Sequence, residues 1–86
     1  MSRTLSSGAF TMRFATEPSV RAAARDARSV GFVVAVEADG ASGWLMVSRR
    51  RHPFAADDAL RYARRLQTIA TEHGGDYEDF VEETRV

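Results

Sequence analysis

The chain has 86 residues, of which 44% are hydrophobic and 28% charged, and its formal net charge is zero. This length allows one domain, and the composition is that of a folded globular chain rather than a disordered one. The chain contains no cysteine, which excludes disulfides, thiolate metal sites and thiol nucleophiles. No apolar run is long enough for a membrane-spanning helix, and residues 1–8 lack the apolar stretch of a secretion signal. We therefore expect a cytoplasmic protein that does not engage a membrane.

The charges are unevenly distributed, and every one of the twelve basic residues is arginine. Residues 1–51 hold eight arginines and four acids, whereas residues 52–86 hold four arginines and eight acids. The zero net charge argues against general nucleic-acid binding, which requires an excess of positive charge. The segregation favours self-association or docking on a charged partner, unless the two halves neutralise each other in the folded domain.

Residues 1–8 are mostly small and polar, and we expect a flexible tail there, followed by a single domain over residues 9–86. Residues 9–15 alternate between apolar and other side chains, which predicts a half-buried strand. One face of this strand carries Phe10, Met12 and Phe14.

A helix is predicted next, because Thr16 is a suitable cap and Pro18 is tolerated in the first helical turn. Gly31 supplies the C-terminal stop. Apolar residues recur at helical spacing on the inner side: Val20, Ala23, Ala24, Ala27 and Val30. The outer side carries an arginine stripe that suits either a solvated face or a binding site: Arg21, Arg25 and Arg28.

Two further strands are predicted around a glycine-rich turn. Residues 32–36 are a β-branched run, residues 39–43 are a turn cluster, and residues 44–48 resume the extended pattern. Together they predict an antiparallel hairpin, which residues 49–53 bring to an end.

The second helix follows, and Asp57 and Asp58 suit the positive end of its dipole. Asp57 can pair with Arg61 one turn later. The apolar stripe of this helix comprises Ala59, Leu60, Ala63, Leu66, Ile69 and Ala70. The run His73-Gly74-Gly75 ends the helix, and residues 76–83 predict a last, acidic strand.

The order strand, helix, strand, strand, helix, strand predicts an α+β domain of the ferredoxin-like split βαβ type. Right-handed connections would place both helices on one face of a four-stranded antiparallel sheet with strand order 4-1-3-2. The last strand would then be an edge strand whose acids either discourage unwanted pairing or dock a basic partner. Arg13 on the neighbouring strand could form an ion pair with these acids, and that pairing would weaken the docking interpretation.

The sequence lacks the residue patterns of an enzyme active site. His52 and His73 are the only histidines, neither has a nucleophile beside it, and His73 is most simply explained by the negative end of its helix. Asp57 and Asp58 project about 100° apart on a helix, so they do not form a dyad. Gly74 and the following glycine lack the spacing of a phosphate loop. We expect no catalytic residue, no metal ligand and no cofactor.

RNA-recognition modules share this fold and stack bases on aromatic residues of their central strands. Residues 43–48 match their third-strand motif poorly, because aliphatic side chains occupy the stacking positions. Trp44 has two interpretations: an exposed tryptophan on the face away from the helices would suit an interaction hot spot, whereas a buried one would complete the core.

Residues 66–80, which contain His73-Gly74-Gly75-Asp76-Tyr77 and end with Glu78-Asp79-Phe80, resemble the end of the regulator of ribonuclease E activity B family. Proteins of that family close with a helix, a Gly-Gly pair and an acidic-Tyr-Asp-Gly-Trp type segment. Here Asp79 replaces a glycine and Phe80 stands for the tryptophan. The hairpin segment 43–47 and the order of elements over residues 9–83 also resemble the family. The resemblance implies a ferredoxin-like protein inhibitor of ribonuclease E, without cofactor or catalytic residue.

We therefore expect a non-enzymatic, protein-binding regulator whose partner is ribonuclease E or an RNA-processing complex that controls RNA decay. The alternatives are a dimeric ligand-binding or structural module and, more weakly, a nucleic-acid binder that uses Arg49, Arg50, Arg51 and the helix arginines. The candidate protein-interface residues are Arg13, Trp44, Arg49, Tyr77 and Phe80.

Overall fold

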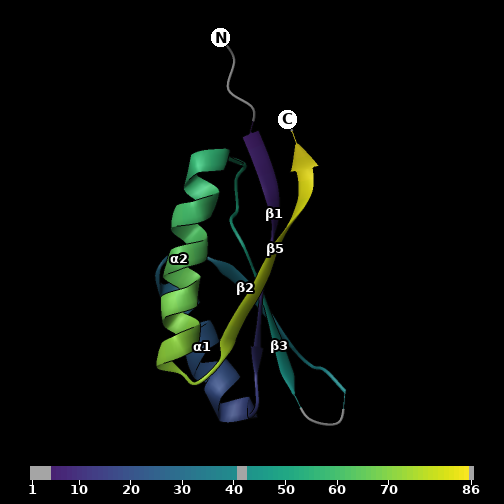
Figure 1. Cartoon of the computed structure of the whole chain (residues 1–86), viewed down its shortest axis with the longest axis vertical. Coiled ribbons are helices and arrows are strands. Elements are labelled where there is room, and N and C mark those ends of the chain that lie inside the picture. Colours follow the sequence, from purple (N-terminus) through teal and green to yellow (C-terminus); the bar gives the residue numbers. More distant parts are fainter. Residues whose placement is uncertain (1–4, 41–42, 86) are drawn as a thin grey trace.

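The computed structural model describes residues 5–40 and 43–85, which form one antiparallel sheet and two helices. The strands are β1 (Leu5–Phe14), β2 (Val33–Ala38), β3 (Trp44–Arg49), β4 (Phe54–Ala55) and β5 (Asp76–Arg85). The helices are α1 (Glu17–Ser29) and α2 (Ala56–Glu72), and Figure 1 shows both on the same side of the sheet. The predicted α+β class is therefore confirmed.

The sheet is built around β1, which has neighbours on both edges. Phe10 pairs with Ser48 of β3 and with Phe80 of β5, and Ser6 pairs with both β4 and β5. β5 thus follows one edge of β1, while β3 and β4 succeed each other along the opposite edge. β2 pairs with β3. The prediction of a four-stranded sheet was wrong, since the two-residue strand β4 is a fifth strand and the strand order differs accordingly.

The bounds of the first strand also differ from the prediction. β1 begins at Leu5, so residues 5–8 of the predicted tail belong to the sheet, and residues 1–4 lie outside the described residues. Ser6 and Gly8 are buried in this stretch. Glycine is required at position 8 because a Cβ there would collide with the backbone of Val81 and the ring of Phe80. Residues 6–8 resemble a polar tail in the sequence because this part of β1 has room only for small residues.

The helix α1 begins and ends where its capping residues predict. The Thr16 side chain accepts a hydrogen bond from the Ser19 N–H, and Pro18 lies in the first turn. At the other end Gly31 has a φ of 98°, and the Phe32 N–H donates to the Ala27 carbonyl. These bonds form a Schellman motif, which satisfies the last carbonyls and turns the chain into β2.

The helix α2 has no side-chain cap, and its first turn relies on acidic residues near the positive end of the dipole. Arg61 pairs with Asp58 at 3.2 Å, rather than with Asp57 as the spacing suggested. The helix also ends in a Schellman motif, in which Gly74 has a φ of 74° and the Gly75 N–H donates to Ala70.

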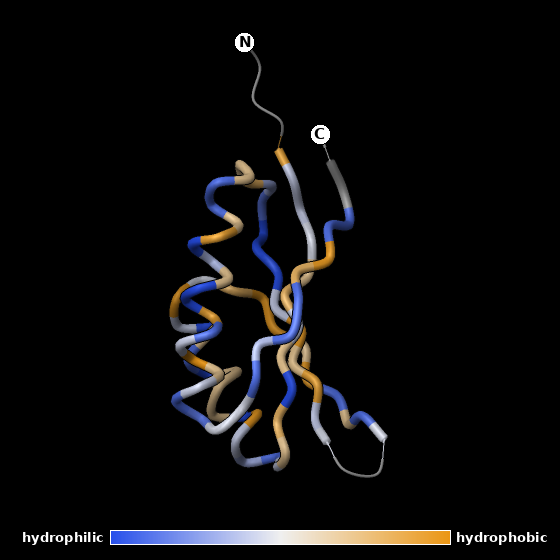
Figure 2. Tube along the Cα trace, viewed as in Figure 1, coloured by the Kyte–Doolittle hydropathy of each residue, from blue (hydrophilic) through white to orange (hydrophobic). Residues whose placement is uncertain are grey.

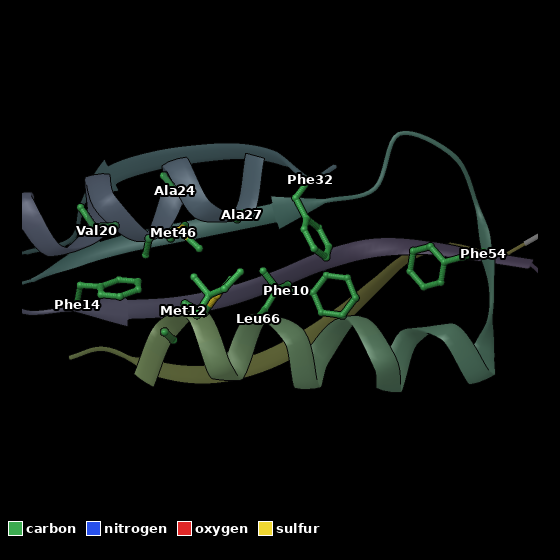
Figure 3. Packing of buried hydrophobic residues seen from close by; sticks show 13 residues of the cluster. Phe10, Met12, Phe14, Val20, Ala24, Ala27, Phe32, Met46, Phe54 and Leu66 are labelled. Carbon is green, nitrogen blue, oxygen red and sulfur yellow. The ribbon is translucent and has the colours of Figure 1, made fainter. Parts of the chain in front are cut away.

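The core lies between the sheet and the two helices, where β1 contributes fully buried residues to the layer that both helices cover (Figure 3). In Figure 2 hydrophobic and hydrophilic positions alternate along the helices, as expected for helices with one covered side. The buried residues of this core are Phe10, Met12, Phe14, Val20, Ala23, Ala24, Ala27, Phe32, Met46, Phe54, Leu66, Ile69 and Ala70. Each element therefore presents one side to the core, and within residues 5–40 and 43–85 the opposite side of the sheet carries no helix.

Candidate functional site

The side of the sheet that faces away from the helices is called the open face here. Strand side chains alternate between the two faces, and paired residues on neighbouring strands share a face. Because Phe10 and Met12 point into the core, the intervening residues of β1 and their partners point outward. The open face comprises Val33, Ala35, Glu37, Leu45, Val47, Arg49, Ala9, Thr11, Arg13, Asp76, Asp79 and Val81.

Apolar side chains of β2, β3 and β5 lie on the open face, and together they are called the apolar band. Val33 on β2 is 49% exposed and Val81 on β5 is 51% exposed, while Leu45 and Val47 on β3 are half-buried. Val33 pairs with Arg49 and Val81 with Ala9, so a charged residue lies beside the exposed valine of β2. Leu60, at 57%, is another large hydrophobic residue with comparable exposure, and it lies on α2. An apolar band rimmed by charges is typical of a surface that contacts another macromolecule.

Carboxylates surround Arg13 at one end of this band. The Arg13 guanidinium forms ion pairs with Asp39 of the β2–β3 turn and with Glu78 of β5, the latter at 2.9 Å. The pair with Glu78 confirms the predicted link to the acidic strand. Glu37 and Asp76 lie in the same cross-strand row as Arg13. One cation among four carboxylates gives this end of the face a negative charge.

A second ion pair begins at Arg49, the cross-strand partner of Val33. Arg49 of β3 donates two hydrogen bonds of 2.9 Å to the Glu83 carboxylate of β5, and the pair spans the intervening strand β1. The hydrogen bond from Arg49 holds the pKa of Glu83 below its usual value and raises the pKa of the guanidinium. This bidentate arrangement holds the Arg49 side chain across β1, beside the apolar band.

The structure divides the five candidate interface residues between two faces. Arg13 and Arg49 lie on the open face, whereas Trp44, Tyr77 and Phe80 pack against the core beneath the helices. Burial, followed by the nearby charge of Asp79, raises the pKa of Tyr77. Trp44 is half-buried and pairs with Phe14, which places it on the helix side. Trp44 therefore packs against the core and is not an exposed aromatic of the open face.

The apolar residues of the open face are absent from the candidates chosen from the sequence. Their signal is present in residues 33–36, which are apolar on both faces of the strand. A strand with one solvated face is expected to alternate, whereas a strand covered on both faces is apolar throughout. The continuous apolar run in β2 therefore indicates that the outward-facing side of this strand is also apolar.

Arg50 has a structural environment that differs from that of its neighbours in the arginine run. Its guanidinium carbon lies 5.1 Å from the centroid of the Phe32 ring and 4.8 Å from that of Tyr62. One of its nitrogens also donates to the carbonyl of Val30, near the end of α1. Since Arg49 pairs with Glu83, two of the three arginines in this run have partners within the chain, which weakens the nucleic-acid alternative.

We expect Arg50→Ala to lower the free energy of unfolding by about 2 kcal/mol, because two cation–π contacts and a charged hydrogen bond are lost. Arg51→Ala is the matched control, since Arg51 is exposed, and it is expected to change stability by no more than about 0.5 kcal/mol. Urea denaturation followed by circular dichroism measures both. Equal losses in the two variants would show that the stacked geometry contributes nothing.

Neither helix in the described part of the chain is long and apolar enough to cross a lipid bilayer. Comparisons of the chain with protein-family models, with curated proteins and with solved structures find no match.

Proposed function

We propose that this chain is a non-catalytic binding domain that docks a second protein on the open face of its sheet. The observation that carries the proposal is the apolar band, in which Val33 and Val81 are about half exposed, together with the ion pairs of Arg13 and Arg49 beside it. An antiparallel sheet can leave one face to solvent, but the exposed apolar residues of the open face favour a macromolecular partner as its cover. The charged rim then sets the orientation of the partner.

The partner should combine apolar side chains with lysine or arginine. The Arg13 end of the open face holds four carboxylates and one guanidinium, so it attracts a cationic surface. The same charge repels phosphate groups, which makes a nucleic acid an unsuitable ligand for this face. A protein with a basic patch beside an apolar one fits both parts of the surface.

The resemblance of residues 66–80 supports ribonuclease E, or an RNA-processing protein associated with it, as the partner. In the structure this segment forms the end of α2, the Gly74-Gly75 turn and the first half of β5. We infer a split βαβ arrangement to which β4 is an addition, supported by the pairings of β5 with β1, β1 with β3 and β3 with β2. On this proposal the chain modulates RNA decay by binding the nuclease.

The test is binding of the purified chain to purified ribonuclease E, measured by calorimetry and by inhibition of RNA cleavage. The double variant Val33→Lys with Val81→Lys removes apolar contacts and repels a basic partner. We expect it to weaken binding at least about tenfold, as for the loss of a hot spot. Leu60→Lys makes the same change at an equally exposed position on α2, and it should bind like the unmodified chain.

Two results would contradict the proposal. The first is saturable binding of ribonuclease E that survives the double substitution and is lost in Leu60→Lys, which would move the interface to the helices. The second is a homodimer, detected by analytical ultracentrifugation, that the double substitution dissociates while no nuclease binds. In that case a second copy of the chain covers the open face. Melting temperatures of all variants establish that each is folded.

A further inference from the structure

Three side chains with metal-ligating atoms meet where the C-terminal end of α2 packs against α1. Asp26 lies near the end of α1, Glu72 is the last residue of α2 and His73 follows it. One ligand atom from each residue lies within 4.8 Å of the other two. The shortest separation joins His73 Nε2 to Asp26 Oδ2 at 2.6 Å. The sequence separates Asp26 from the other two residues by an entire hairpin, so the cluster is a product of the fold.

The electrostatic setting of the cluster favours a cation. The C-terminal end of a helix carries partial negative charge, and the last turn of α2 contains no basic residue to neutralise it. A cavity of about 160 Å³ adjoins the cluster and is lined by Asp26 and Glu72. Arg65 also lines this cavity, and the two carboxylates outnumber its single guanidinium. The site is therefore both accessible and negatively charged.

We propose that Asp26, Glu72 and His73 bind a divalent transition-metal ion of the zinc type. One imidazole nitrogen with two carboxylate oxygens is a donor set that suits Zn²⁺, whereas Ca²⁺ and Mg²⁺ prefer oxygen ligands throughout. Ligand atoms around tetrahedral zinc lie about 3.4 Å apart, so small rotations of two partly exposed carboxylates bring the cluster to that spacing. Three protein ligands leave the fourth position for water or for a group from a partner.

Metal binding would replace the hydrogen bond between His73 and Asp26. The Nε2 atom coordinates the ion through its lone pair, and a neutral imidazole then holds its proton on Nδ1. A protonated imidazole releases one proton to solvent on binding. In either case the ion joins the end of α1 to the end of α2, which stabilises the contact between the helices. This site lies on the helix layer and does not depend on the proposed docking face.

The experiment is calorimetric titration of the untagged chain with ZnCl₂, with the absorption of bound Co²⁺ as a second probe of geometry. We expect one ion per chain, an increase in melting temperature that a chelator reverses, and visible bands typical of four-coordinate Co²⁺. Glu72→Gln and His73→Ala should each weaken Zn²⁺ binding at least about tenfold, since even outer-shell changes at metal sites cost that much.

The control is His52→Ala, because His52 is exposed, lies outside the cluster and is the other histidine of the chain. It should bind Zn²⁺ like the unmodified protein. Glu72 is exposed, so Glu72→Gln tests the site without removing the pair between Asp26 and His73. Absence of saturable Zn²⁺ binding in the unmodified chain overturns the proposal. So does equal affinity in Glu72→Gln and the unmodified chain, which would leave the cluster as an ion pair between helices.

Discussion

Phe10→Ala is expected to lower the free energy of unfolding by about 4 kcal/mol, which is most of the stability of a domain this small. The Phe10 side chain is completely buried, and its ring lies 4.6 Å from that of Phe80, centroid to centroid. The rings of Phe32, Phe54 and Tyr62 lie between 6.2 and 6.4 Å away. These rings come from α2, β4, β5 and the segment before β2, so the substitution opens a cavity where most of the fold meets.

Chemical denaturation followed by far-ultraviolet circular dichroism and by Trp44 fluorescence measures this loss. Phe10→Leu is the matched control, because it keeps an apolar side chain of similar volume, and it should cost less than half as much as alanine. A loss below about 1 kcal/mol for Phe10→Ala would mean that the aromatic cluster collapses onto the vacated space. The burial seen in the structure would then overstate the contribution of this ring.

The helix ends and the inner face of the central strand could be predicted from the sequence because local rules determine them. Phe10 and its alternate neighbours share a face whatever the strand pairs with, and Thr16 caps a helix by a contact only three residues long. Gly31 and Gly74 adopt positive φ at helix ends for an equally local reason. Each of these features depends on residues within about one turn of each other.

The features that the sequence did not predict depend on contacts between distant segments. The strand β4 exists because β1 continues beyond the end of β3 and leaves an edge that Phe54 and Ala55 occupy. The two residues are too few to show alternation. The approach of Asp26 to His73 is likewise set by how two helices pack, which no spacing along the chain encodes. Tertiary packing therefore created both the extra strand and the proposed metal site.

The acidic residues of β5 have two explanations, discouraging unwanted strand pairing or docking a basic partner, and the structure gives individual acids different partners. Glu78 and Glu83 are paired with arginines of the open face, which limits their availability to a partner. Glu37 of β2 and Asp39 of the β2–β3 turn come from the opposite edge of the sheet and contribute to the same negative end, where Asp39 shares Arg13 with Glu78. The negative charge available for docking thus comes from both edges of the sheet. The sequence of the acidic strand alone does not indicate where this charge lies.

Gly75→Ala is expected to lower the free energy of unfolding by about 3 kcal/mol, although the change adds one methyl group. A Cβ at this position would overlap the ring of Phe14, which is 2% exposed, and would lie 2.9 Å from the backbone oxygen of Arg13. Neither neighbour can move away, since the ring is enclosed by the core and the oxygen belongs to the central strand. The start of β5 must therefore shift.

Gly74→Ala is the control, because a Cβ there would meet open space and only the positive φ is unfavourable. We expect this change to lower the free energy of unfolding by about 1 kcal/mol. Position 74 needs glycine for its backbone conformation, whereas position 75 needs it because of packing. Adding Phe14→Leu should relieve part of the Gly75→Ala loss, giving a double variant less destabilised than the sum of the single changes. Strict additivity in urea denaturation would show that the methyl group and the ring do not meet. The close approach of the Gly-Gly turn to the core would then not be the reason for a glycine at position 75.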